Sequence, residues 1–116
     1  MSKKEQAKRD AARQAAEEEI RRIRLPKGEE TLGIVDQRVG GSRMFVRCLD
    51  GKQRVCRIPG RLKKRLWVRE RDIVIIEPWE FGGDEKGDVI LKYRPNQVSW
   101  LRKNGYLRTL EEADEF

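Results

Sequence analysis

The clearest alternation of apolar and polar residues lies between residues 43 and 58. Successive side chains of a β-strand point to opposite faces, so this stretch divides into two rows. The apolar row consists of Met44, Val46, Cys48, Cys56 and Ile58. The other row is basic with some apolar members, and it consists of Arg43, Phe45, Arg47, Leu49, Gln53, Val55 and Arg57. The pattern predicts a β-hairpin with an apolar inner face and a basic outer face.

The Asp-Gly pair at residues 50–51 is a strong signal for the turn of this hairpin. A two-residue loop there would place an apolar residue opposite Arg57 and mix the two rows. A three-residue loop over residues 50–52 places Val46 opposite Cys56 instead. Because the buried face normally fixes the register, we predict the three-residue loop.

This register also determines which residues lie opposite the two cysteines of the chain. Cys48 would face Arg54, which lies on the inward parity, and Cys56 would face Val46. We therefore expect both thiols to be free and to fill the core as small apolar groups. A disulfide between them is the alternative.

Three further segments have the pattern of strands. The first covers residues 31–39, and Gly33 inside it predicts a bulge or sharp coil of a closing barrel. Residues 72–79 are apolar on both parities at their centre, so we expect that strand to be buried on both faces. Residues 88–94 alternate again, and we expect antiparallel pairing throughout.

A helix is predicted to cover the outer face of the fourth strand. Pro95 suits the first turn of this helix, which carries Leu101 and stops at Asn-Gly, residues 104–105. Beyond it, Thr109 and Glu112 have the spacing of a capping box, within an acidic end that we expect to be loose.

A basic turn follows the third strand, beginning at residues 59–60, Pro-Gly. Leu62 and Leu66 lie four residues apart, so one face of a single helical turn can plug the end of a barrel. Four cations remain outside, namely Arg61, Lys63, Lys64 and Arg65. Trp67 closes the turn, and the sequence allows it either to pack under the plug or to face solvent.

These elements predict an all-β fold. Five short strands, a helical turn between the third and fourth, and a C-terminal helix packed on the barrel match the S1-like OB-fold barrel. We expect a basic flexible N-terminal arm over residues 1–28, the barrel over residues 29–94, the packed helix over residues 95–108, and an acidic flexible tail over residues 109–116. Residues 1–24 contain good helix formers but little apolar surface, so a solubilising tail and a contact arm fit the arm equally.

The charge of the chain reduces the range of partners to be considered. The chain has 27 Lys and Arg against 20 Asp and Glu, a formal net charge of +7. Between Arg43 and Arg71 there are eleven basic residues and two acids. Such an excess indicates a polyanionic partner, nucleic acid ahead of an anionic membrane surface. With neither a membrane-spanning stretch nor a signal peptide in the sequence, we expect a soluble cytoplasmic protein.

The residue types argue against catalysis and for binding. The sequence has no histidine, no cysteine pair with metal-ligand spacing and no phosphate-cradling glycine loop, so we expect no enzyme, metal or cofactor. Cations attract phosphates, and aromatic faces stack on unpaired bases. The candidate RNA-contacting residues are Arg43, Phe45, Arg47, Arg57, Arg61, Lys63, Lys64, Arg65, Trp67 and Arg69. Trp79 and Trp100 are assigned to packing.

Three motifs also resemble a known family: DGKQRVCRIPGRLKKRLW at residues 50–67, DVILKYR at residues 88–94 and VSWLRKNGYL at residues 98–107. In this order they are similar to translation initiation factor 1A of the archaeal and eukaryotic type, over residues 29–108. The resemblance implies a non-catalytic protein that binds the decoding (A) site of the small ribosomal subunit through ribosomal RNA. It also implies a role in placing initiator tRNA and mRNA and in subunit joining with an initiation GTPase. We also expect a monomer.

Carried over by position, the family's RNA contacts fall on Arg57, Arg61, Lys63, Lys64, Arg65 and Trp67. Two features depart from the family pattern: Arg71-Asp72 stands where Gly-Asp is frequent, and the acidic end is short. The alternative function is a general single-stranded RNA-binding OB-fold chaperone. Such a module would be expected to cluster several aromatics on one sheet face, where this sequence offers Phe45.

Overall fold

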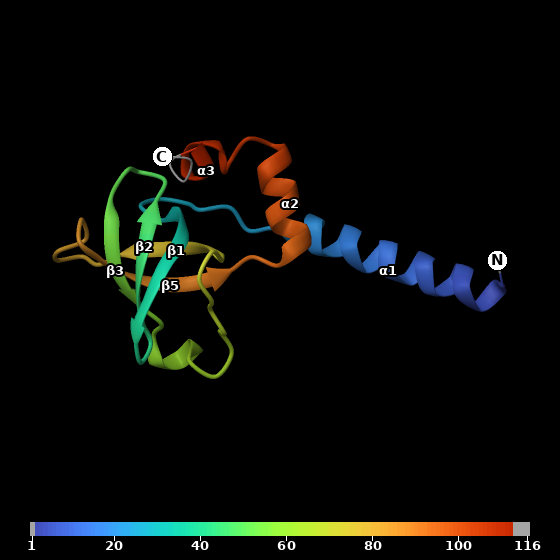
Figure 1. Ribbon diagram of the computed structural model, residues 1–116, viewed down its shortest axis with the longest axis horizontal. Helices are drawn as coiled ribbons and strands as arrows, with labels where there is room; N and C mark the ends of the chain where they lie inside the picture. The colour runs from blue at the N-terminus through green and yellow to red at the C-terminus, as the bar shows by residue number, and fades with distance from the viewer. Residues whose placement is uncertain (1, 113–116) are drawn as a thin grey trace.

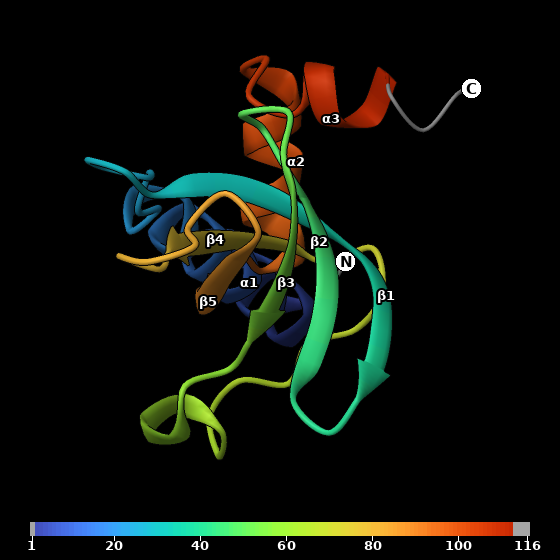
Figure 2. The ribbon, with the colours of Figure 1, turned by 90° about the vertical axis from the view of Figure 1, so that its left-hand side faces the viewer.

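The computed structural model describes residues 2–112, and its centre is a closed five-stranded barrel (Figures 1 and 2). The strands are β1 (Thr31–Gly40), β2 (Arg43–Cys48), β3 (Gln53–Arg57), β4 (Ile73–Pro78) and β5 (Lys86–Lys92). Their order around the barrel is β1-β2-β3-β5-β4, with β4 returning to β1, so the barrel has the predicted OB-fold layout. The β3–β5 pair is parallel, and the expectation of antiparallel pairing throughout was therefore wrong. A closed ring of five strands cannot reverse direction at every neighbour.

The helices lie outside the barrel. They are α1 (Lys3–Arg21), the short 3₁₀ turn η1 (Gly60–Leu62), α2 (Pro95–Lys103) and α3 (Arg108–Glu112). Figure 1 shows α1 extending away from the barrel past α2, with η1 at the opposite end from α3. Among the described residues, no helix combines the length and apolar character needed to cross a bilayer.

The fourth strand is buried on both faces, as predicted. Val74 and Ile76 point into the barrel interior, where the inward residues of the other strands form the inner cluster. Ile73 and Ile75 point outward and pack in a second, outer cluster with Leu101 of α2. The predicted helical cover is thus confirmed.

The outer cluster extends beyond the predicted helix. Leu107 and Leu110 are buried in it, so the segment after α2 folds back onto the barrel as α3. Thr109 lies inside α3 and does not precede it, so the capping-box reading was wrong. The acidic tail predicted over residues 109–116 starts within α3, and its part from residue 113 onward lies outside the described residues. Its flexibility stays a prediction.

The hairpin has the predicted faces but not the predicted register. Met44, not Val46, pairs with Cys56, a shift of two residues that leaves each side chain on its expected face. The loop is three residues long, over residues 49–51, because the Cys48 backbone N–H donates to the Lys52 carbonyl at 2.9 Å. Both cysteines are buried and free, as expected.

The loop sits one residue earlier because of Asp50 and Gly51. The Asp50 carboxylate accepts the Lys52 backbone N–H at 3.1 Å and also binds Arg54. Gly51 takes φ +87°, a left-handed conformation that glycine adopts without steric cost. These local contacts fix the turn, and the alternation of side chains alone could not reveal them.

Gly33 allows β1 and β2 to approach each other closely and does not form a bulge. A Cβ atom at this position would lie 2.5 Å from Val46 Cγ1 and 3.1 Å from the Arg47 carbonyl oxygen. The irregularities of β1 fall between Val35 and Gln37 and between Arg38 and Gly40. The predicted position of the bulge was therefore wrong, because the irregularities lie after the residues of β1 that close the barrel by pairing with β4.

The N-terminal segment forms helix α1, and none of its residues is buried. It contacts α2 through Glu19, whose carboxylate accepts from Asn96 Nδ2 at 3.0 Å and lies 3.6 Å from Arg94. The Glu19 carbonyl accepts from Gln97 Nε2 at 3.0 Å. The flexibility expected for residues 1–28 stays a prediction.

Candidate nucleic-acid interface

A row of charged side chains crosses three strands of the barrel. Arg43 on β2 pairs in register with Arg57 on β3, and Arg57 pairs with Asp88 on β5. Side chains that are directly opposite on neighbouring strands share a face. The Arg57 Nε atom donates to Asp88 Oδ1 at 3.2 Å, while Arg43 is exposed. Two of the predicted cations are thus adjacent on the outer face of the barrel.

A hollow of about 470 Å³ joins this row to the basic turn. Its walls include Arg43 and Arg57 from the hairpin and Lys63 from the basic turn. The rest of the wall comes from the β1–β2 turn and the start of η1, with Gly40, Gly41, Ser42, Ile58, Pro59 and Gly60. Three cations from separate parts of the sequence therefore surround one concave surface.

The basic turn is anchored as predicted. Leu62 and Leu66 are partly buried and pack against the inner cluster, so they close this end of the barrel. The backbone N–H of Leu66 donates to the Leu62 carbonyl at 2.9 Å, which completes one helical turn. The four cations of the turn, Arg61, Lys63, Lys64 and Arg65, are all exposed. The leucines thus fix the basic turn on the barrel, and its four cations face solvent.

Trp67 faces solvent, with 78% of its surface exposed. Its carbonyl accepts from Lys92 Nζ at 2.8 Å, and Lys92 also lies 3.2 Å from Asp72. Trp67 borders two hollows, of about 700 and 460 Å³; the first also includes Arg69, and the second includes Arg65. Of the two possibilities left open by the sequence, the structure has the exposed indole.

The turn that leads into β4 has an unusual backbone. Arg71 has φ +76°, in the left-handed region that L side chains rarely adopt. Its backbone N–H donates to the Val35 carbonyl at 2.8 Å. Asp72 closes the turn by accepting the Arg69 backbone N–H at 2.7 Å. This turn sets the direction of Arg69, which lies beside Trp67 in the larger hollow.

Two of the predicted RNA-contacting residues are less accessible to a ligand than the others. Arg47 is half-buried and lies 3.6 Å from Asp36 on β1. Phe45 points outward as predicted but is half-buried, with Gln37 and Val55 as its cross-strand neighbours. The structure therefore does not make Phe45 a fully open stacking platform.

Trp79 was missed. It belongs to neither hydrophobic cluster, so its assignment to packing was wrong, whereas Trp100 does pack on the outer cluster. Arg57 Cζ lies 4.7 Å from the centre of the Trp79 ring, and Lys86 Nζ lies 5.4 Å from it. The sequence did contain a signal for Lys86. Extending the alternation of β5 back by two residues places Lys86 on the same face as Asp88.

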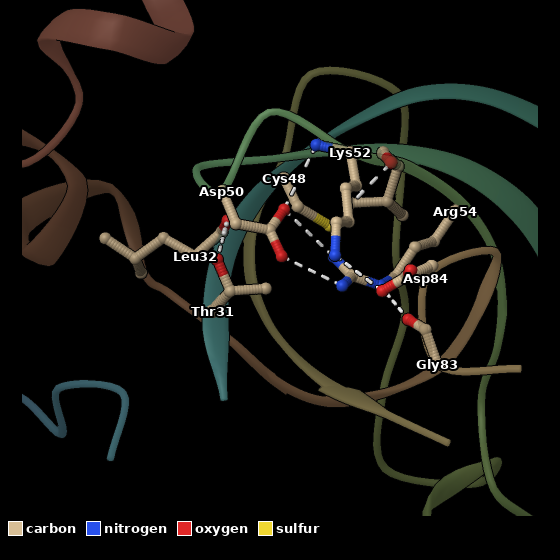
Figure 3. A network of polar contacts seen from close by, with 9 residues as sticks. Thr31, Leu32, Cys48, Asp50, Lys52, Arg54, Gly83 and Asp84 are labelled. Carbon is tan, nitrogen blue, oxygen red and sulfur yellow. Dashed lines mark hydrogen bonds and ion pairs between the residues drawn. The ribbon is translucent and has the colours of Figure 1, made fainter. Parts of the chain in front are cut away.

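A polar network centred on the buried Arg54 side chain holds the loop that follows Trp79 (Figure 3). Arg54, only 2% exposed, donates to both carboxylate oxygens of Asp50 at 3.1 and 2.8 Å and to the Gly83 carbonyl at 2.5 Å. Lys52 reaches Asp84 of the same loop at 2.5 Å. The network ties the hairpin turn to the β4–β5 loop, and so fixes the strand end that carries Trp79.

The charges of this network reinforce each other. Burial disfavours the charged form of Arg54, but Asp50 and Cys48 raise its pKa above the usual value. Burial acts to raise the pKa of Asp50, yet the hydrogen bonds from Arg54 and Lys52 lower it overall. The pair is therefore ionised at neutral pH. Within residues 2–112, no group of three or more Cys, Asp or Glu side chains is placed to hold a metal ion.

Comparison with known proteins gives consistent matches. The sequence model of the family described as "Translation initiation factor 1A / IF-1" matches residues 20–115. A protein named "Translation initiation factor 1A" from Methanococcus maripaludis strain C7 is 52% identical over 96 residues, covering 81% of this chain and 92% of that protein. Proteins of the same name match from Methanothermobacter thermautotrophicus (45% over 91 residues; 78% and 92% covered) and Pyrococcus abyssi (46% over 88 residues; 76% and 78% covered).

Proposed function

The chain belongs to the translation initiation factor 1A family, and from this premise we propose that it binds the small ribosomal subunit at the decoding (A) site through ribosomal RNA. The observation that carries the proposal is the joined cationic surface of the hairpin and the basic turn. Residues 51–69 contain no acidic residue, and Arg43, Arg57 and Lys63 line one hollow. Such a surface tracks a phosphate backbone, and the exposed Trp67 adds a stacking face.

The proposed site comprises ten residues: Arg43, Phe45, Arg47, Arg57, Arg61, Lys63, Lys64, Arg65, Trp67 and Arg69. The exposed cations and Trp67 supply most of the contact. Arg47 and Phe45 take part at the edge, since both are half-buried. The protein acts by binding, without catalysis, because contacts to phosphates fix position and need no chemical step.

The role that follows is to promote placement of initiator tRNA and mRNA and to assist subunit joining with an initiation GTPase. This part of the proposal rests on family membership, as does a cytoplasmic place of action. The mechanism we propose is occupancy: a monomer held in the decoding site by phosphate contacts excludes other ligands and positions the initiation complex.

The test is co-sedimentation of the labelled chain with isolated small ribosomal subunits at physiological salt. A large excess of unstructured RNA serves as competitor. Retention on the subunit supports a shaped ribosomal site. Loss to the competitor would favour the alternative, a general single-stranded RNA chaperone, since phosphates alone would then explain the binding.

A further inference from the structure

The planar guanidinium of Arg57 is held in a fixed orientation on the surface of the barrel. Its guanidinium lies 4.7 Å above the Trp79 ring and donates to Asp88 Oδ1 at 3.2 Å. The same carboxylate oxygen accepts the Trp79 Nε1–H at 2.9 Å. Asp88 therefore orients both the indole and the guanidinium, and a cation over an aromatic face adds attraction. A surface arginine is normally mobile, so this degree of fixation needs an explanation.

The guanidinium also remains available for a ligand. The Arg57 side chain is 57% exposed even though its ring and carboxylate contacts are made. Guanidinium planes are stacking surfaces for unpaired RNA bases, as aromatic rings are. A plane backed by an indole and held at its edge by a carboxylate is pre-organised for that purpose, because little ordering remains to be done on binding.

A small hollow of about 110 Å³ adjoins this plane, lined by Arg43, Val55, Cys56, Arg57, Trp79 and Lys86. The walls combine an aromatic ring with three cations. Arg43 and Arg57 also line the larger hollow that reaches Lys63 of the basic turn. A strand of RNA bound along the basic turn would therefore pass directly from the larger hollow to the smaller one.

We propose that Arg57, backed by Trp79 and Asp88, is a stacking subsite for one unpaired RNA base, with Arg43 and Lys86 contacting the flanking phosphates. The inference rests on the proposed function and adds to it a second site for a base, separate from Trp67 and beside the sites for phosphates. An acidic peptide would use the three cations but has no need of a fixed plane. The variant Arg57→Lys separates these cases, because it keeps the charge and removes the plane.

The experiment uses the full chain and two eight-nucleotide probes, an oligoadenylate and an abasic oligomer with the same phosphates. The wild-type chain should bind the oligoadenylate more tightly. Arg57→Lys should reduce that preference by about 5-fold or more, as expected for the loss of one stacked base. The salt dependence of binding should not change, because the number of phosphate contacts is the same.

Arg108→Lys is the matched control, since Arg108 is exposed on α3 and outside the proposed site. It should leave the preference unchanged. Trp79→Leu is the second variant, and it should lower the preference as Arg57→Lys does. The double variant Arg57→Lys/Trp79→Leu should lose little more than either single variant, because the two side chains act as one unit. Thermal unfolding of each variant shows that it is folded.

The outcomes separate this inference from the proposed function. If Arg57→Lys keeps the wild-type preference for bases while the wild-type chain is retained on small ribosomal subunits, the subsite is wrong and the proposed function stands. If Arg57→Lys loses the preference but the wild-type chain is not retained on subunits, the subsite stands as a general RNA site and the proposed function fails. Equal losses in Arg57→Lys and Arg108→Lys would also overturn the subsite.

Discussion

The Tyr93 hydroxyl donates a hydrogen bond to the Arg24 backbone carbonyl, 69 residues earlier in the chain. Tyr93 is buried in the outer cluster, and Ile23 packs against that cluster beside it. Arg24 in turn binds Glu30 at 2.7 Å. The segment between α1 and β1 is therefore attached to the barrel, and this attachment lies next to the C-terminal end of α1.

Tyr93→Phe should loosen this fastening with little change in packing. Loss of one hydrogen bond at a buried ring should lower the free energy of unfolding by about 1 kcal/mol. Amide hydrogen exchange in residues 22–30 should accelerate more than in β4. Exchange that rises equally in both segments would show that the bond supports the whole fold and not this attachment.

Stability should fall at alkaline pH. Burial raises the pKa of Cys56 to about 12 and that of Tyr93 to about 12, and it also raises the pKa of Cys48. The unfolded chain ionises these groups near their ordinary values, about 8.5 for Cys and 10 for Tyr, so between these values and pH 12 it binds fewer protons than the folded chain. The free energy of unfolding should thus be fully retained below about pH 8.5 and decrease progressively above it.

Urea unfolding in reducing buffer from pH 7 to pH 11.5 measures this effect. Cys56→Ala should make the decrease smaller, because one of the three groups is then absent. A free energy of unfolding that stays constant over this range would contradict the assignment of these groups to a neutral, buried state.

Asp50→Asn should destabilise the chain, because it leaves the buried Arg54 guanidinium without its counter-charge. Since Asp50 is partly exposed, we expect a loss of about 2 kcal/mol, below the range for a fully buried pair. The pKa of Asp50 lies below its usual value, so its contribution is present above the unfolded-state pKa and is lost as the pH falls through the folded-state value.

The check is chemical unfolding of wild type and Asp50→Asn at pH 7 and at low pH. The difference between the two proteins should shrink as the pH falls. The double variant Asp50→Asn/Arg54→Leu should be less destabilised than the sum of its single changes. Full additivity would show that the two side chains do not act as a pair.

Alanine at Lys63, Lys64 and Arg65 together should weaken binding to small ribosomal subunits and flatten its salt dependence. Each lost phosphate contact should lower the slope of log affinity against log salt by about 0.7 to 0.9. The matched control replaces three exposed cations outside the proposed site, Lys27, Lys103 and Arg108. An identical slope in both triple variants would mean that the basic turn is only a solvated face.

Arg71→Gly should be more stable than Arg71→Ala, which removes the same side chain but keeps the left-handed backbone. The left-handed backbone at φ +76° costs an L residue about 1–2 kcal/mol, and glycine avoids this cost while adding flexibility to the unfolded chain. The difference between the two variants should be about 0.5–1 kcal/mol, with the higher Tm for Arg71→Gly. Arg69→Gly, without a left-handed backbone to relieve, should instead lower the Tm.

The sequence predicted those features that depend on which face a side chain occupies. The apolar row of the hairpin, the double burial of residues 73–76 and the Leu62–Leu66 plug are all confirmed. Each depends only on the period of the pattern, which a single segment reveals.

Features that depend on specific contacts, whether local or between distant segments, were missed. The hairpin register follows from local contacts of Asp50 with Lys52 and Arg54, and no alternation of residues encodes those contacts. The position of Trp79 depends on the parallel pairing of β3 with β5, which brings Arg57 and Lys86 to its ring. Burial of Phe45 depends in the same way on its neighbours across β1 and β3.

Helix α1 meets the rest of the molecule through Glu19 and a few polar partners, and no residue of the helix is buried. Separation of α1 from α2 would consequently exchange protein hydrogen bonds for water hydrogen bonds and expose no fully buried residue of α1. That exchange has a small free-energy difference, and it requires no melting of the barrel. Residues 3–21 can therefore change neighbours while every strand keeps its place.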